Sequence, residues 1–122
     1  MSNEKNILKE KSFAFALRTV KLFGYLKKQK NEYDLSKQMM RSGTSVGANI
    51  REAQNAESKL DFIHKLSISQ KECDETLYWL ELLFKAEYLS ELEFDSIYRE
   101  GTEILKILKS VIITTKQNIK KK

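Results

Sequence analysis

Three groups of residues in this sequence have the types and spacing that chemistry would need. Residues 41–53, RSGTSVGANIREA, place two glycines, two serines and a threonine in their first seven positions, as a phosphate-binding loop would. Asp61 and His64 are three residues apart, so on a helix they share one face and could bind a metal. Cys73 could act as a nucleophile if a base activated its thiol.

The context of residues 41–53 argues against a phosphate-binding loop. Such a loop lies between a strand and a helix and supplies a lysine to the phosphates. Here the preceding residues, LSKQMMRS, have helical periodicity, and no Gly-Lys-Ser or Gly-Lys-Thr occurs in the chain. We therefore interpret residues 41–53 as part of a helix whose small side chains let another group come close.

The metal and catalytic hypotheses also lack partners. Di-iron sites in four-helix proteins need two Glu-x-x-His pairs and further carboxylates, whereas this chain has one histidine. Glu72 and Glu75 could add oxygen ligands, but His64 lies in the first turn of its predicted helix, where we expect a solvated side chain. Cys73 is about two and a half turns from His64, so the two form no nucleophile and base pair. We predict no enzymatic activity, no metal, no cofactor, and a buried Cys73.

The composition indicates one all-helical domain spanning residues 1–122. Charged residues make up 32% of the chain and apolar residues 41%, as in typical soluble globular proteins. There is no proline and there are only four glycines, so few residues are available for the turns of a sheet protein. The chain has no apolar run long enough to span a membrane, no signal-peptide core and a single cysteine, so we expect a cytoplasmic protein.

Apolar residues recur every three or four positions in four segments, which predicts four helices. The first, over about residues 3–30, is expected to bury Phe13, Leu17, Val20 and Gly24. The buried stripes of the other three are expected to be Leu35, Met39, Gly43, Val46, Ile50 and Ala53, then Phe62, Leu66, Cys73, Leu77, Leu80 and Phe84, then Ile97, Gly101, Ile104, Leu108, Val111 and Ile112.

Short connectors join the four predicted helices. Asp34 or Ser36 is a candidate N-cap for the second helix, and the patterns Ser58-x-x-Asp61 and Ser90-x-x-Glu93 resemble capping boxes for the third and fourth. Connectors of this length place consecutive helices side by side in opposite directions. The prediction is an antiparallel up-down-up-down four-helix bundle.

Gly43 and Gly47 need an explanation inside the second helix, because a helical glycine costs about 1 kcal/mol relative to alanine. We expect close packing to compensate, with a backbone or a large ring from Phe23, Tyr25 or Trp79 filling the groove. Packing between helices of one chain is the first interpretation. The alternative is a subunit interface along the same strip.

Polar residues form a row beside the apolar face of each of the two central helices. The rows consist of Ser42, Ser45, Asn49 and Glu52 on the second helix, with Arg41 on the same side, and of Lys65, Ser69, Glu72 and Thr76 on the third. We favour a hydrogen-bonded seam that fixes the register of the two helices. A binding groove is the alternative.

The net charge of +5 is unevenly spread along the chain. Residues 1–31 hold eight Lys or Arg and two Glu. In the predicted bundle both chain ends lie at one end of the rod and bring together Lys5, Lys9, Lys11, Lys116, Lys120, Lys121 and Lys122. Such a cluster predicts binding of nucleic acid or another polyanion, although a solvated lysine-rich end is the alternative.

The run from Arg41 to Leu83, RSGTSVGANIREAQNAESKLDFIHKLSISQKECDETLYWLELL, resembles the central signature of the 23S rRNA-intervening sequence protein family. The family's recurrent positions fall here on Arg41, Ser42, Ser45, Asn49, Ile50, Glu52, Glu72 and Glu75. Arg51 stands where relatives often have alanine, and Ala53 where many have glycine.

The resemblance implies a non-enzymatic antiparallel four-helix bundle that assembles into a ring of five subunits. It suggests association with ribosomal RNA, mainly because of where the family's genes lie. A related member, the accessory protein of diversity-generating retroelements, is a similar basic pentamer that works with a reverse transcriptase and nucleic acid.

Taken together, the residues and the resemblance predict a non-catalytic, homo-oligomeric accessory protein that binds RNA or DNA phosphates with its lysines. The alternative is a structural or protein-interaction module in which the Gly43/Gly47 strip, Tyr78 and Trp79 mediate assembly. We expect neither a membrane nor a small-molecule substrate among its partners.

Overall fold

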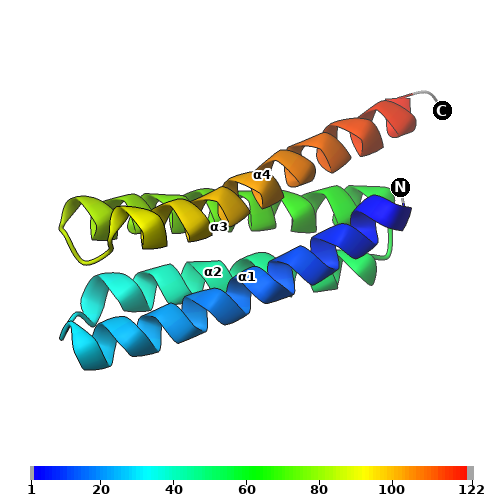
Figure 1. Cartoon of the computed structure of the whole chain (residues 1–122). Coiled ribbons are helices and arrows are strands. Elements are labelled where there is room, and N and C mark those ends of the chain that lie inside the picture. Colours follow the sequence, from blue (N-terminus) through cyan, green and yellow to red (C-terminus); the bar gives the residue numbers. More distant parts are fainter. Residues whose placement is uncertain (1, 121–122) are drawn as a thin grey trace.

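The computed structural model describes residues 2–120, with side chains from Asn6 onward. These residues form four helices, α1 (Ser2–Gln29), α2 (Asp34–Gln54), α3 (Lys59–Lys85) and α4 (Glu91–Lys120). Consecutive helices run in opposite directions, and the two ends of the chain lie at the same end of the molecule (Figure 1). The predicted up-down-up-down bundle is confirmed.

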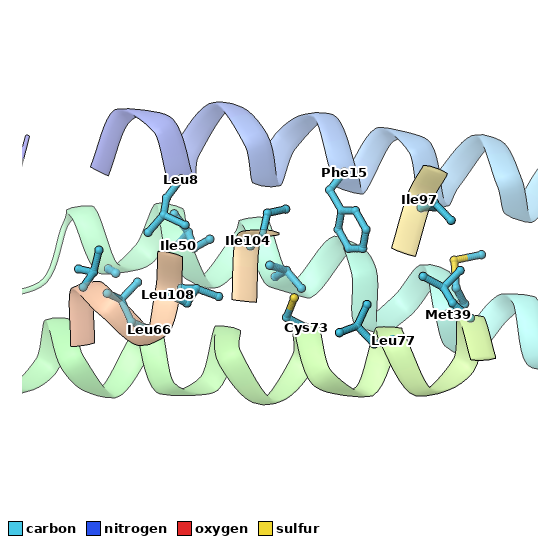
Figure 2. Packing of buried hydrophobic residues seen from close by; sticks show 14 of the residues in the cluster. Leu8, Phe15, Met39, Ile50, Leu66, Cys73, Leu77, Ile97, Ile104 and Leu108 are labelled. Atoms are coloured by element: carbon cyan, nitrogen blue, oxygen red, sulfur yellow. The ribbon is translucent and has the colours of Figure 1, made fainter. Parts of the chain in front are cut away.

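Each helix packs against its two neighbours around the bundle, and the contact between α1 and α4 is the smallest of the four. Buried side chains from all four helices meet along the axis, with Phe15, Cys73, Leu77 and Ile104 near the middle (Figure 2). The predicted stripes of α2, α3 and α4 face this core, except that Leu35 and Phe84 lie at its edge. None of the helices in residues 2–120 is long and apolar enough to cross a membrane.

The outward face of α1 is the face that the sequence predicts to be buried, so that prediction is wrong. Phe13, Leu17 and Val20 are 62%, 46% and 44% exposed, whereas Leu8, Phe15 and Leu26 enter the core. Two buried polar residues, Ser12 and Thr19, lie on the core face between them. Ser12 and Thr19 interrupt the apolar pattern of the core face, so the apolar stripe on the outer face is the more regular of the two stripes.

The helix starts follow local hydrogen bonding. Ser90 and Glu93 form a complete capping box: Ser90 N–H donates to Glu93 Oε1 at 2.8 Å, and Glu93 N–H donates to Ser90 Oγ at 3.1 Å. Ser58 Oγ accepts from Asp61 N–H at 3.0 Å, as predicted. At α2 the expected caps are wrong, because the Glu32 carboxylate accepts from Leu35 N–H and Ser36 N–H instead.

Candidate functional site

Residues 41–53 lie within α2, so the run rich in small residues is helical and forms no loop. Gly43 and Gly47 face α1, where their neighbours are the Thr19 side chain and the Ser12 backbone. The expected fillers Phe23, Tyr25 and Trp79 are therefore wrong. Two small buried residues of α1 occupy this face of α2, and the glycines let the two helix backbones approach closely.

The two polar rows meet in a seam between α2 and α3. At its buried part, Thr76 Oγ1 donates to Ser42 Oγ at 2.8 Å and Ser69 Oγ donates to the Val46 carbonyl at 2.8 Å. These bonds link fixed positions on the two helices. They support the interpretation that the rows set helix register.

The outer part of the seam is charged and more exposed. Arg41 pairs with Glu75 at 2.7 Å, and the same carboxylate oxygen accepts from Trp79 Nε1 at 3.1 Å. Lys65 pairs with Glu52 at 3.0 Å, and the hydrogen bond from Lys65 to that carboxylate raises the pKa of the ammonium. The bond to Glu75 joins the Trp79 indole to a residue one turn earlier on the same helix.

Ser45 and Asn49 turn back to their own helix. Ser45 Oγ donates to the Arg41 carbonyl at 2.9 Å, and Asn49 Nδ2 donates to the Ser45 carbonyl at 2.9 Å. Glu72 Oε1 is buried and has no hydrogen-bond partner among the described residues. Most of the polar residues at the family's recurrent positions therefore form hydrogen bonds or ion pairs within the bundle.

Cys73 and His64 occupy different environments. Cys73 is fully buried, its thiol donates to the Gly101 carbonyl, and burial raises its pKa to about 12. A thiol with this pKa is protonated at neutral pH and is a weak nucleophile. His64 is exposed, and no group of three or more His, Cys, Asp or Glu among the described residues could hold a metal ion.

The structure describes the side chains of four of the seven lysines in the predicted cluster. Lys9, Lys116 and Lys120 are exposed, while Lys11 pairs with Glu103 of α4 at 2.6 Å. Lys121, Lys122 and the side chain of Lys5 lie outside the described residues. These lysines lie in the first turns of α1 and the last turns of α4, and those two helix ends lie at the same end of the bundle (Figure 1).

The opposite end of the bundle carries a second group of charged residues, in which the sequence mixes Lys27, Lys28 and Lys30 with Glu91, Glu93 and Asp95, and all six are exposed. Lys27 and Lys37 lie within 5.4 and 5.5 Å of the ring centroid of Tyr33, which is 43% exposed. Lys28 and Lys30 are exposed nearby in the sequence. The sequence signal was the presence of three aromatic residues and four lysines between Phe23 and Lys37.

The outer face of α1 carries exposed apolar side chains and Gly24, which has no side chain. A β-carbon added at Gly24 would meet nothing within 4 Å, in contrast to the other three glycines. Beside Phe13 a groove of about 390 Å³ opens toward α2 and is lined in part by the small residues Ala16, Gly47 and Ala48. Gly24 therefore has no packing role within residues 2–120.

Comparison with known proteins gives a consistent result. The family model of the 23S rRNA-intervening sequence protein matches residues 4–110. The chain is similar to a protein of unknown function from the S23 ribosomal protein family of Bacteroides thetaiotaomicron, whose crystal structure was solved at 1.70 Å. The two share 50% identity and a TM-score of 0.88 over 89% of this chain and 97% of that one. The comparison with curated proteins finds no match.

Proposed function

We propose that this chain, which belongs to the 23S rRNA-intervening sequence protein family, is a non-catalytic accessory protein that binds nucleic acid as a homo-oligomer. The observation that carries the nucleic-acid part is the group of exposed lysines at the end of the bundle that holds both chain ends. The family's name connects it with 23S rRNA, which agrees with a polyanionic partner. The cytoplasmic location stays a prediction from the sequence.

The distribution of ion pairs supports this proposal. Lys11, Arg18, Arg41 and Lys65 are each paired with a carboxylate of a neighbouring helix. At the chain-end side Lys9, Lys116 and Lys120 are exposed. Phosphates are attracted to such lysines without regard to base sequence, and binding releases counterions.

Neutralising lysines at this end tests the proposal. The double variant Lys116→Gln/Lys120→Gln should bind single-stranded RNA more weakly at low salt, and its salt dependence should fall by a slope of about 1.4 in log K against log salt. Lys71→Gln/Lys106→Gln removes the same charge from the middle of exposed helix faces and is the matched control. Equal losses in both variants, or no loss in either, would argue against a site at this end.

The outer face of α1 supports the homo-oligomer part of the proposal, with a second copy of this chain as the occupant. A second apolar stripe, on the face of a helix that points away from the core, is typical of a surface that another molecule covers. Gly24 lies on the same line as Phe13, Leu17 and Val20, and its cost within the helix is offset if a neighbouring subunit packs against the bare backbone. We propose five subunits from the family resemblance.

Solution mass tests this second part. Phe13→Ser/Leu17→Ser should lower the mass of the assembly, because both side chains leave the proposed interface. Leu92→Ser is the control, since Leu92 is 83% exposed on α4 and its loss removes exposed apolar surface outside α1. A wild-type protein of single-chain mass would contradict the proposal. Assembly without RNA binding would favour the alternative, a protein-interaction module.

A further inference from the structure

We propose that the loop end of the bundle, around Tyr33, is a stacking site for single-stranded nucleic acid. The inference rests on the proposed function, and it adds a ligand class and a place remote from the lysines at the chain ends. The site consists of Tyr33 and Phe23 together with Lys27 and Lys37.

The geometry of the site places two ammonium groups over one aromatic ring. The rings of Phe23 and Tyr33 have centroids 5.7 Å apart and an interplanar angle of 55°, so Tyr33 is supported from the α1 side. Lys27 Nζ lies 5.4 Å and Lys37 Nζ 5.5 Å from the Tyr33 centroid. Tyr33 is still 43% exposed, so a ligand can reach its side chain.

The backbone of the loop explains why exposed lysines outnumber exposed acids around Tyr33, although the connection between α3 and α4 at the same end carries exposed acids such as Glu91 and Glu93. Asn31 has φ 54°, the left-handed conformation that often ends a helix, and it turns the chain after α1. Glu32 then points inward: it is 7% exposed, and its carboxylate accepts from Leu35 N–H and Ser36 N–H. The loop therefore hides one of its two acids. The exposed charged residues between positions 27 and 37 are Lys27, Lys28, Lys30, Asp34 and Lys37.

The chemistry of this group matches an unpaired nucleotide. A base can stack on an aromatic ring whatever its identity, and lysines beside the ring can contact the adjoining phosphates. In a duplex the faces of the bases are covered by their neighbours, so the ring has nothing to stack on. A site of this kind therefore selects single strands over duplexes while reading little sequence.

Tyr78 shows that an exposed tyrosine alone does not give this combination. Tyr78 is 55% exposed on α3, but Asp74 and Glu81, one turn away on either side, are exposed acids. Phosphates are repelled there. Tyr78 is thus a matched control of the same residue type and similar exposure.

The test measures binding of a labelled oligouridine of about 12 nucleotides, a length within the site sizes of known single-strand-binding domains. Tyr33→Leu keeps an apolar side chain against Phe23 but has no ring, and we expect about tenfold weaker binding. Tyr33→Phe keeps the ring and should bind within about twofold of wild type. Tyr78→Ala should leave the affinity unchanged. Circular dichroism and thermal melting verify that each variant is folded.

A duplex of the same length and polyglutamate are the comparison ligands. The inference predicts that Tyr33→Leu weakens oligouridine binding and leaves binding of the duplex unchanged. It is overturned if Tyr33→Leu binds oligouridine as wild type does, or if polyglutamate binding depends on Tyr33 to the same degree. Wild-type protein that binds no oligouridine at low salt would overturn the proposed function as well, which separates the two failures.

Discussion

Gly43 and Thr19 face each other across the contact between α1 and α2 at a distance that admits no side chain on Gly43. A β-carbon there would lie 2.6 Å from Thr19 Cγ2 and 3.0 Å from Thr19 Cβ. Thr19 is fully buried, and its hydroxyl donates to the Ala16 carbonyl at 2.7 Å, so it cannot easily rotate away. We predict that Gly43→Ala lowers the free energy of unfolding by about 1–3 kcal/mol, although alanine is the better helix former.

Urea unfolding of a double-mutant cycle measures this contact. Thr19→Ser removes the methyl group nearest to the new β-carbon, so Gly43→Ala should cost less in the Thr19→Ser background than in wild type. Equal costs in the two backgrounds would mean that the clash lies elsewhere.

Replacing Gly24 should change two quantities in opposite directions: the monomer should become more stable and self-association should become weaker. Because a β-carbon at Gly24 meets nothing within the chain, Gly24→Ala should raise the free energy of unfolding of the monomer by about 1 kcal/mol. The same substitution should weaken self-association, since the added methyl holds a neighbouring backbone away. Denaturation at high dilution measures the first effect, and solution mass against protein concentration measures the second. A stabilised variant with unchanged association would place the interface elsewhere.

Glu32 should be a stabilising residue although it is charged and buried. Its carboxylate satisfies two N–H groups in the first turn of α2, where the helix dipole also favours negative charge. Glu32→Ala should lower the free energy of unfolding by about 1–2 kcal/mol, as other lost N-terminal caps do. Asp34→Ala, an exposed acid at the same helix start, should cost less. Thermal unfolding of the two variants compares them, and equal losses would contradict the capping role.

Cys73 should make stability fall at alkaline pH. Its thiol has a pKa of about 12 in the folded chain against an ordinary 9.0, so above pH 9 the unfolded chain releases a proton that the folded chain keeps. The free energy of unfolding should then decrease by up to about 1.4 kcal/mol per pH unit between pH 9 and 12 from this group. Cys73→Ala should be less stable at neutral pH, where it leaves a cavity, but it should lack this contribution. The difference in the free energy of unfolding between wild type and Cys73→Ala, measured by urea unfolding from pH 7 to 11, should become smaller as pH rises.

The sequence was sufficient to predict the bundle, its topology and most of its core. On α4 the predicted residues, among them Ile97, Gly101 and Leu108, are all buried, because one face is apolar and the other is not. The capping box at Ser90 also follows from local sequence, since its bonds join residues only three apart. Such features depend on few distant contacts.

The core face of α1 could not be predicted from periodicity. Phe13, Leu17 and Val20 are spaced like a core stripe, while the true core face carries Ser12 and Thr19. Those two residues are small because α2 comes close at Gly43 and Gly47, which only the packed structure reveals. The Tyr33 cluster was missed for a related reason. Glu32 turns inward to cap α2, so that more lysines than acids stay exposed beside Tyr33, and this turn depends on where α2 begins.

The most direct test of the account is the affinity of the wild-type protein for a single-stranded RNA across a series of salt concentrations. If exposed lysines hold phosphates, log K should fall linearly with log salt, by about 0.7 for each phosphate neutralised. Measurable binding at low salt with such a slope is the predicted result. Absence of binding at low salt, or an affinity that salt does not change, would contradict it.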